Sequence, residues 1–443
     1  MEEIYVKEAA ERGKESQRRW NYYDGKHDLP LKPQKDNYND NVIVNHVASL
    51  SERLTAFLVG DGVTFDAGGD DQQTDQDEAI ETLWAANRGA ILQESLALSG
   101  VIDGHCAVRL EPRQGLPPKI LRLKMPQFTA FWDAFDMQRV LWYRLQHQSA
   151  GMGKRVDYVR GQVEDEAINH DAPGWLEIVY EMNAKGDWIR GDILVWPFEF
   201  APVVDWQNLP NVNGYYGKSD ITGAISLNDA LNFILSNMQR IIKHHASPKT
   251  VGLGFSATEI VGTEVGGFFT VNRPRPEVDI FNLEMQSDLQ SSMKLADIIT
   301  AGLWQSGGMV DPATIKDKVG ALTNFGLRVL FSDAIKRTEG KRLLYGEAFE
   351  AINKNALIIS GQAAPDVIKT VWPDVLPEDT QEITSALLQE LERRVISMQT
   401  YRTLRGYDDE QETDRLSQET ETGDIGGAIL GLINNNRPFN RGA

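Results

Sequence analysis

The sequence has little of what membrane, disulfide and basic nucleic-acid-binding proteins need. Its 443 residues include one cysteine, Cys106, which excludes a disulfide framework and a zinc site built on cysteines. No run approaches the roughly 18 apolar residues that predict a membrane-spanning helix. The first twenty residues alternate charges without an apolar segment and predict no secretory signal. We therefore expect a soluble protein made in the cytosol.

Basic residues are scarce relative to acidic ones. Lys and Arg number 45 and Asp and Glu number 64, so the formal charge is −19. A surface that grips nucleic acid or an anionic membrane needs net positive charge, which argues against both as the main activity. This charge does not argue against a protein that lets DNA pass without holding it. The length predicts about three structural units, and 41% apolar residues are ordinary for globular domains.

No catalytic or cofactor-binding motif is complete, so the sequence predicts no catalytic, cofactor-binding or metal-binding residue. Residues 214–219 resemble the end of a phosphate-binding loop, but Val212 occupies the position where that loop needs its first glycine. His244 and His245 are adjacent and would point to different faces of a helix, which makes a poor metal pair. Cys106 lies in an apolar strand pattern and is expected in the core.

The N-terminal half predicts helices followed by a β-rich section. Charge and apolar spacing predict helices over residues 1–20, 41–58 and 78–98. Between residues 116 and 200, short β-branched and aromatic runs separated by turns are typical of an antiparallel sheet. The tryptophans of this section would suit a sugar-binding platform, but packing is their commoner role. The pattern predicts a mixed α+β fold.

Two helices with matched apolar stripes are the clearest pattern of the second half. The first stripe steps by 4, 3, 4 and 3 residues: Leu227, Leu231, Ile234, Met238 and Ile241. The second repeats this stepping over residues 283–304, and a short glycine-rich insert with strands is expected between them. A single helical pair has a thin core, so these stripes also suggest packing against neighbouring copies.

The remaining segments predict a loop and further helices. Residues 305–324 contain three glycines and a proline and few apolar residues, which is typical of a loop between long helices. Residues 325–359 predict a helix whose inward residues are Val329, Ile335, Leu343, Ala348, Phe349, Ile352 and Leu357. Residues 378–405 predict a helical pair broken near Ser397.

Several segments are informative as an ordered set. They are WNYYDGKH at 20–27, NVIVNHV at 41–47, FLVGD at 57–61, NLPNVNGYYGKSD at 208–220, LNDALN at 227–232, WPD at 372–374, LP at 376–377, ISMQT at 396–400 and DDE at 408–410. In this order they resemble the portal proteins of tailed double-stranded DNA bacteriophages with long non-contractile tails. The resemblance covers nearly the whole chain.

This resemblance implies an α+β portal fold that assembles as a ring of twelve subunits. Its parts would be a mixed α/β wing, a two-helix stem, a small β-containing clip and an α-helical crown. The implied boundaries are 1–220 for the N-terminal wing with its β-rich section, 221–246 for the first stem helix, 247–282 for the clip, 283–304 for the second stem helix, 305–324 for a tunnel loop, 325–356 for a long wing helix and 357–443 for the crown and a flexible C-terminus.

The implied function is structural and not enzymatic, with no cofactor. The ring would form a channel at one capsid vertex, through which genomic double-stranded DNA is packaged and later ejected. Implied partners are the large terminase, then the head–tail adaptor, and the major capsid and scaffolding proteins, with no membrane. The ring would assemble in the host bacterial cytoplasm and end in the virion. Twelve copies would carry a charge of about −230, which disfavours static binding of phosphate.

The resemblance also implies three sets of candidate site residues. The first would contact DNA from the tunnel loop: Asp311, Thr314, Lys316 and Lys318. The second would form a positive belt where stem meets clip: Lys243, His244, His245 and Lys249. The third would contact partners on the clip: Arg273 and Arg275. Each set also has a plainer interpretation, namely solvated lysines on a loop, positive charge at a helix end, and protection of a strand edge.

Two other functions stay open from the residues alone. An enzyme with an acidic aromatic cleft, such as a glycoside hydrolase, would bring two carboxylates together in a deep pocket. A different virion ring, such as an adaptor or connector, is the third possibility, which the chain length and the long loop between helices disfavour.

Overall fold

The structure is a computed structural model, and it divides the chain into two units. It describes residues 2–33, 39–68, 74–133, 135–149, 152–164, 167–169, 172–246, 249–254, 279–283, 289–313, 324–375, 380–407, 409, 412–413 and 415–416. The first unit is Met1–Val375 and the second is Leu376–Ala443. In these ranges, every helix is too short or too polar to cross a bilayer.

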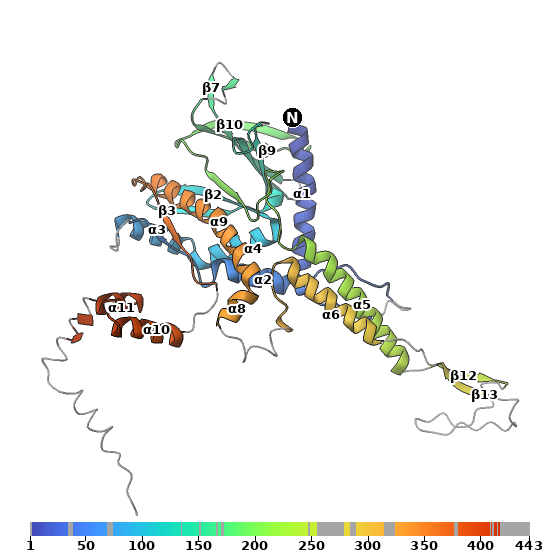
Figure 1. The fold of residues 1–443 in the computed structure, drawn as a ribbon. Helices are drawn as coiled ribbons and strands as arrows, with labels where there is room; N and C mark the ends of the chain where they lie inside the picture. The colour runs from blue at the N-terminus through green and yellow to red at the C-terminus, as the bar shows by residue number, and fades with distance from the viewer. Residues whose placement is uncertain are drawn as a thin grey trace, which may run out of the picture. The chain divides into compact units, whose positions relative to one another are not determined.

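Helices of the first unit surround and extend from a set of small sheets (Figure 1). The helices are α1 Glu2–Tyr23, α2 His46–Val59, α3 Asp75–Ala86, α4 Gly89–Asp103, α5 Thr222–Ala246, α6 Leu289–Ser306, α8 Asn324–Leu330 and α9 Ser332–Ile359. The strands are β1 Thr64–Asp66, β2 His105–Arg113, β3 Leu116–Arg122, β4 Phe128–Trp132, β5 Val140–Ser149, β6 Met152–Arg160, β7 Gln162–Glu164, β8 Ala167–Asn169, β9 Trp175–Met182, β10 Trp188–Trp196, β11 Val203–Gln207, β12 Lys249–Leu253, β13 Asp279–Leu283 and β14 Lys369–Val371.

The predicted antiparallel section is confirmed. Its largest sheet has the strand order β10-β9-β6-β5-β4, and a second sheet has the order β11-β2-β3. All of these neighbours pair antiparallel. Tryptophans and tyrosines fill the space between the sheets, and Trp175, Trp196 and Tyr158 are buried. These aromatic residues therefore serve packing and form no exposed sugar platform.

The helix α1 covers the β4 side of the larger sheet. Tyr5 donates a hydrogen bond to the carbonyl of Trp132, and the Arg12 guanidinium donates to the carbonyls of Met125 and Phe128. Arg12 also lies 3.8 Å from the ring centroid of Tyr216. These contacts fix one edge of the sheet against a helix, while α9 packs on β11 and β2 of the other sheet.

Three predicted helix boundaries are wrong, for local reasons. The helix expected over 41–58 begins at His46, because Asn45 caps it and residues 41–45 are extended. The helix expected over 78–98 is two helices, because Arg88 adopts a left-handed conformation with φ of 62°. The helix expected from residue 283 does not include Leu283, which belongs to β13 and pairs with Lys249 of β12; the described helix α6 is Leu289–Ser306.

The second unit contains a helical pair, as predicted. Its helices are α10 Thr380–Glu392 and α11 Met398–Leu404. Ser397 caps α11 by accepting a hydrogen bond from the backbone N–H of Thr400 at 3.1 Å. The predicted break near Ser397 is therefore confirmed.

Candidate functional site

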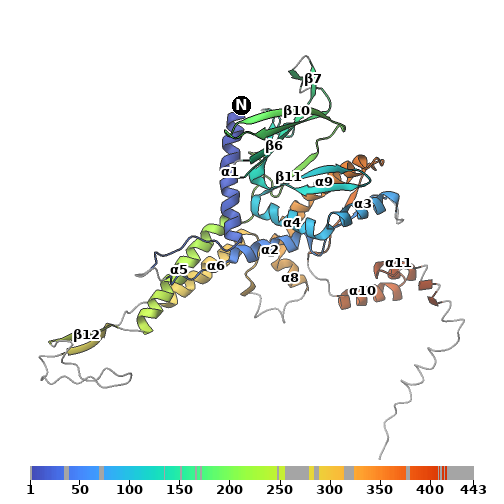
Figure 2. The same ribbon diagram turned by 180° about the vertical axis from the view of Figure 1, so that it is seen from behind.

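The helices α5 and α6 form an antiparallel pair that lies side by side in both views (Figure 1, Figure 2). Their predicted stripes meet in the seam between them. Leu231, Ala296 and Leu303 are buried, and a Cβ added to Gly302 would lie 4.0 Å from Leu227. The near ends of both helices also enter a core cluster with α1, α2 and α4. The pair is thus rooted in the body of the first unit.

Apolar side chains outside this seam stay exposed on both helices. They are Phe233 and Ile242 on α5, and Met293, Leu295 and Ile298 on α6. Ile298 is the most exposed, with 69% of its surface accessible. Single exposed apolar residues are normal on a monomer, but five on one helical pair leave apolar surface that this chain does not cover.

An extended segment, residues 39–46, runs antiparallel along α5 and is held by a ladder of polar side chains. Asn232 accepts a hydrogen bond from the N–H of Val44 at 2.9 Å, and Ser236 accepts one from the N–H of Val42 at 3.0 Å. At the end of the ladder, the Arg240 guanidinium pairs with Asp40 at 2.7 Å. We call residues 39–46 the strap.

The spacing of this ladder follows from the geometry of its two partners. The ladder residues Asn228, Asn232, Ser236 and Arg240 lie four apart on α5, and they hold every second residue of the strap. Four helical residues rise about 6 Å and two extended residues span about 6.6 Å, so the two repeats stay in step over this short length. The strap therefore stiffens one face of α5, and its last residue, His46, opens α2.

Tyr22, at the end of α1, provides another link to α5. Its hydroxyl donates to both carboxylate oxygens of Asp229 at 2.9 Å. Burial, followed by this hydrogen bond, raises the pKa of Tyr22 to about 12. The neutral hydroxyl is therefore the form that the folded chain retains.

We expect Tyr22→Phe to lower stability at neutral pH and to have a smaller effect at high pH. The unfolded chain loses the tyrosine proton near pH 10 and the folded chain only near pH 12, so Tyr22 makes wild-type stability fall as pH rises through this window. Phenylalanine has no such proton. Urea unfolding of both proteins at pH 8 and pH 11 checks this. A gap between their midpoints that stays constant contradicts it.

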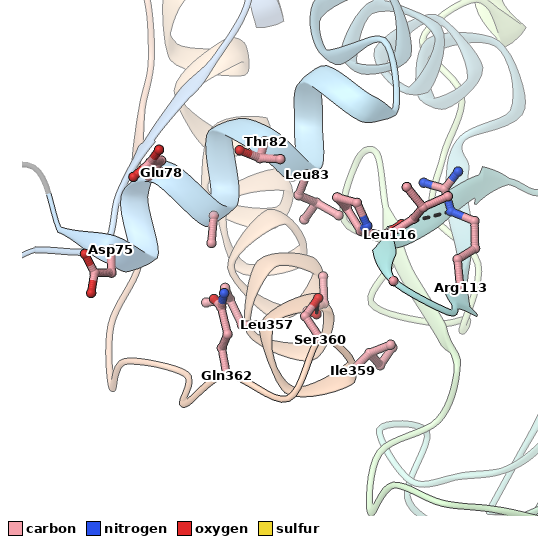
Figure 3. Close-up of a pocket in the computed structure, with 14 residues that line it drawn as sticks. Asp75, Glu78, Thr82, Leu83, Arg113, Leu116, Leu357, Ile359, Ser360 and Gln362 are labelled. Carbon is pink, nitrogen blue, oxygen red and sulfur yellow. Dashed lines mark hydrogen bonds between the residues drawn. The ribbon is translucent and has the colours of Figure 1, made fainter.

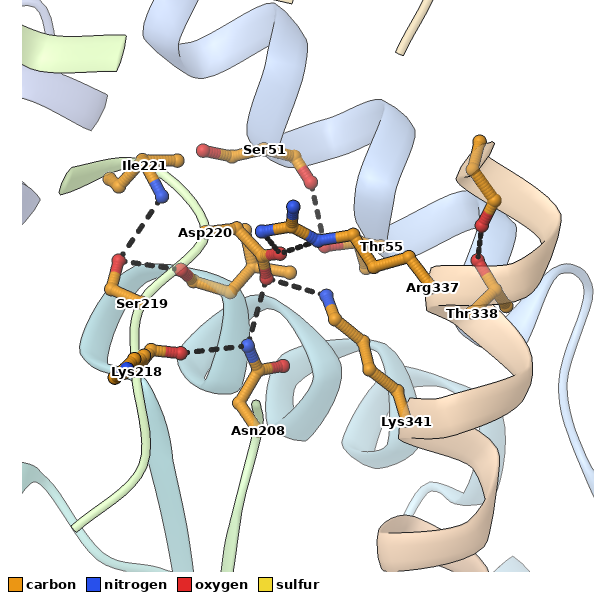
Figure 4. A network of polar contacts seen from close by, with 12 residues as sticks. Ser51, Thr55, Asn208, Lys218, Ser219, Asp220, Ile221, Arg337, Thr338 and Lys341 are labelled. Carbon is orange, nitrogen blue, oxygen red and sulfur yellow. Dashed lines mark hydrogen bonds and ion pairs between the residues drawn. The ribbon is translucent and has the colours of Figure 1, made fainter. Parts of the chain in front are cut away.

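A buried charged network holds the segment that leads into α5 (Figure 4). The carboxylate of Asp220 accepts hydrogen bonds from the Arg337 guanidinium at 2.9 Å and from the side-chain amide of Asn208 at 2.8 Å. It also pairs with the Lys341 ammonium, which comes from the next turn of α9. The network thereby joins α9 to Asp220, two residues before the start of α5.

The centre of the network, formed by Asp220 and Lys341, is removed from water, and Arg337 is partly exposed. Lys341 is 2% exposed, and burial lowers its pKa although Asp220 opposes this shift. Tyr345 extends the network by donating to Asn208 at 3.2 Å. The buried carboxylate of Asp220 has three donors and is well satisfied. Without Asp220, the Lys341 ammonium would be a buried charge that no negative group compensates.

Close backbone packing also holds the segment that leads into α5. Gly104 has φ of 85°, and a Cβ on it would lie 2.5 Å from the backbone nitrogen of Ser219. A Cβ on Gly217 would lie 2.4 Å from the carbonyl oxygen of Gly104. No other residue type fits at either position without movement of the backbone. The loop 208–220 is thus fixed to the turn between α4 and β2 before α5 begins.

Cys106 lies beside this network and is buried, as predicted. Its thiol contacts the Leu96 carbonyl at 3.2 Å and the Tyr345 hydroxyl at 3.4 Å. Burial raises the thiol pKa to about 12. Cys106 therefore has the surroundings of a core residue and not of a nucleophile.

We expect the Cys106 thiol to resist alkylation in the folded protein. At pH 8 a thiol with a pKa of about 12 is roughly one ten-thousandth thiolate, and the side chain is inaccessible. Iodoacetamide labelling followed by intact-mass measurement checks this, with labelling in guanidinium as the control. Rapid labelling without denaturant would contradict the packing described.

A surface hollow beside α3 gives no support to glycosidase chemistry. It has a volume of about 540 Å³ and lies between α3, the β2–β3 turn and the end of α9 (Figure 3). Its carboxylates are Asp75 and Glu78, which come from neighbouring positions of one helix and point in different directions. Paired acid–base catalysis needs two carboxylates aimed at a shared point. This hollow does not offer that arrangement.

The structure describes only part of the predicted site residues. Asp311 directly precedes the helical residues 312–313, and its side chain accepts a hydrogen bond from the N–H of Ala313 at 2.9 Å. Lys243 is exposed near the end of α5. The backbones of His244, His245 and Lys249 belong to α5 and β12, but their side chains lie outside the description. The others lie outside the described residues altogether: Thr314, Lys316, Lys318, Arg273 and Arg275.

Two features of this region were missed by sequence reasoning. The polar ladder was visible as polar residues four apart on a helix that is otherwise apolar, at 228, 232, 236 and 240. The pairing of Asp220 with Lys341 joins residues 121 positions apart, and no local pattern signals it.

Comparison with known proteins identifies the family. The family described as phage portal protein, SPP1 Gp6-like, matches residues 3–425. The chain belongs to this portal protein family. Portal proteins are structural parts of the virion and not enzymes, so the glycoside hydrolase alternative is wrong.

Family membership also gives the general role. This portal protein acts at a capsid vertex of the virion, as part of a ring oligomer through which double-stranded DNA is packaged and ejected. The α+β portal fold expected from the sequence is confirmed.

Solved structures with a similar fold come from gene transfer agent particles. A chain from the virion of a native particle is 16% identical, with a TM-score of 0.45, and the match covers 81% of this chain and 88% of that one. A chain from the neck of an empty particle, computed with C6 symmetry, is 15% identical, with a TM-score of 0.48 and coverage of 82% and 90%. No curated protein matches this sequence.

Proposed function

We propose that α5 and α6 form the stem of this portal ring and that neighbouring stems pack through apolar side chains outside the α5–α6 seam. The observation that carries this is the exposed set on both helices, led by Ile298 on α6 and Phe233 on α5. A ring that closes by rotation needs two different patches on each subunit, one for each neighbour. Apolar residues on two different helices meet that requirement.

The remaining parts follow the order of the chain. We assign residues 1–220 to the wing, 247–282 to the clip, 305–324 to the tunnel loop, 325–356 to the long wing helix and 357–443 to the crown. The wing–stem boundary at 220 is supported by the network around Asp220, which fixes the last residues before α5. The stem segments are 221–246 and 283–304, of which α6 covers the part from Leu289.

A ring of this chain suits DNA in transit. Each copy carries a formal charge of −19, so the assembled channel has little tendency to retain phosphate. Lysines on the tunnel loop would be local exceptions that touch the DNA backbone without reading its sequence. The belt near Lys243 and the clip residues Arg273 and Arg275 would act in the same charge-based way toward DNA or partners.

The partners we propose are other virion and packaging proteins. During assembly in the host cytoplasm, the clip would dock the large terminase and later the head–tail adaptor. The wing would meet the major capsid and scaffolding proteins. These assignments follow from membership of the portal family and from the order of segments along the chain.

Electron microscopy and native mass spectrometry of the purified protein test the ring. We expect class averages with a central opening and a mass that is a whole multiple of the subunit mass, with twelve as the proposed number in the virion. A monomer that stays monomeric under all assembly conditions would overturn the proposal.

We expect Lys316→Ala with Lys318→Ala to impair DNA packaging or retention while rings still form. The reason is the loss of two positive charges where the channel would approach phosphate. A matched control removes two exposed lysines of the wing, Lys119→Ala with Lys185→Ala. Packaged DNA per particle is the measurement. Failed assembly with normal DNA handling in surviving particles would show that these lysines are not part of a tunnel loop.

A further inference from the structure

The strand β10 is an open edge of the five-stranded sheet. The sheet order places β10 at one end and β4 at the other. The helix α1 packs against β4, whereas no described residue pairs with the outer side of β10. A strand edge carries a row of backbone N–H and C=O groups that can pair with a further strand.

The side chains of β10 make this edge unusually apolar. Ile189, Leu194 and Val195 are 57%, 55% and 77% exposed. A bulge between Arg190 and Ile193 interrupts the register, but the residues that follow it, 193–196, contain no charge. Natural edge strands are usually protected by charges, prolines or bulges along their length. In β10 the bulge and the charged residues lie before Ile193, so the second half of the strand has no such protection.

A groove beside this edge is lined by apolar side chains, by the acids Glu181 and Asp192 and by one base, Arg190. It has a volume of about 530 Å³ and is lined by residues of β9 and β10 that include Val179, Ile189 and Leu194. On the same face, Glu181 lies opposite Ile189 and Glu177 lies opposite Leu194. Residues 175–200 contain five acids and two bases. The groove therefore favours a positively charged occupant.

We propose that β10 accepts a sixth strand from a partner protein, an extended segment in which apolar and basic residues alternate. Backbone hydrogen bonds to the β10 edge would supply affinity. Successive strand residues point to opposite faces, so the apolar residues would cover Val195 on one face. The basic residues would face Glu177 and Glu181 on the other face, beside Leu194. DNA is disfavoured as the occupant because this acidic surface repels phosphate.

A second copy of this chain fits the edge less well. β10 contains one base, Arg190, and one acid, Asp192, so a second β10 would bring no net positive charge to Glu177 and Glu181. Pairing of β10 with β10 is also two-fold symmetric, whereas a ring closes through contacts between different patches. The symmetry argument rests on the ring of the proposed function, whereas the charge argument is independent of it.

The test uses full-length assembled protein and a fluorescein-labelled peptide of eight residues that alternates valine and lysine. We expect saturable binding by anisotropy, weakened roughly tenfold or more by Val195→Lys, because the new charge would lie among the valines of the added strand and replace an apolar contact. Val195 is mostly exposed, so this change should leave folding intact. The matched control is Val212→Lys at a position that is 89% exposed and belongs to a loop outside the sheet. It should bind like the wild type.

Two further peptides separate strand addition from charge attraction. A peptide N-methylated on alternate residues cannot pair its backbone and should not bind, and one with glutamate in place of lysine should bind far more weakly. Hydrogen exchange should show protection within 188–196 when the first peptide is bound. The proposal is overturned if the valine–lysine peptide does not bind, or if Val195→Lys or N-methylation leaves binding unchanged. A particle mass altered by Val195→Lys would overturn it in favour of a second copy.

Discussion

Ile298→Asp is expected to abolish ring formation while leaving the subunit folded. Ile298 lies on α6 with 69% of its surface accessible, so an aspartate there meets water in the monomer and changes its stability by no more than about 0.5 kcal/mol. In a ring that buries this position, the carboxylate would be desolvated without a partner, at a cost of several kcal/mol for each contact. Because every subunit contributes such a contact, the effect on assembly should be close to complete.

Light scattering and thermal unfolding together measure this result. We expect Ile298→Asp to give monomers with an unchanged unfolding transition, and Ile298→Leu to form rings as the wild type does. The leucine variant changes the shape of the side chain but keeps it apolar, so it separates an effect of shape from an effect of polarity. Normal rings from Ile298→Asp would place the subunit interface on another surface and would remove the main support for the stem contacts proposed here.

The stem pair could be predicted because its pattern is local. Apolar residues that step by 4 and 3 along a helix share one face whatever surrounds them. Leu231 and Leu303 lie in the seam for this reason. The same residues could not reveal the strap, because residues 41–45 carry apolar spacing that suits a helix but bind instead to the polar ladder of α5. A tertiary contact thus decides the conformation of a segment whose own pattern is ambiguous.

The helix α9 shows why the charged network was missed. Leu343 was predicted to face inward and is 72% exposed, and Val329 on α8 is exposed too. The buried residues in the first half of α9 include Thr338 and Lys341 instead. Apolar periodicity pointed to the wrong face because the true one is polar, and a buried lysine is justified only by Asp220, far away in the sequence. Farther along α9, Phe349 and Ile352 are buried as predicted.

Asp220→Asn is expected to be the most destabilising single change described here. It keeps the shape of the side chain but removes the negative charge that faces Lys341 and Arg337. Removing one partner of a buried ion pair costs about 3–5 kcal/mol, because the remaining charge stays away from water without compensation. Asp333→Asn, on the exposed first turn of α9, removes the same charge and should cost less than about 1 kcal/mol. Urea unfolding at pH 7 compares the two variants.

The double variant Asp220→Asn with Lys341→Met should recover much of the loss. It replaces a buried charge with an apolar side chain of similar length, and such replacements are often neutral or stabilising. A double variant no more stable than Asp220→Asn would show that the loss comes from altered packing around Asn208 and not from the unpaired lysine.

The pH dependence of Asp220→Asn identifies the cause of its instability. Burial already lowers the pKa of Lys341, so the unfolded chain binds more protons than the folded chain in the window below the ordinary lysine pKa of about 10.5. Stability therefore rises with pH across this window. Asp220 opposes the lowering of the Lys341 pKa, so its loss should lower that pKa further. The pH range over which stability rises with pH should then extend closer to neutral pH. We expect the gap in urea midpoint between Asp220→Asn and wild type to narrow as pH rises from 7 to 10. A difference in urea midpoint that does not change with pH would mean that Lys341 is not the buried charge that Asp220 compensates. The contact between α9 and the segment before α5 would then depend on packing and not on charge.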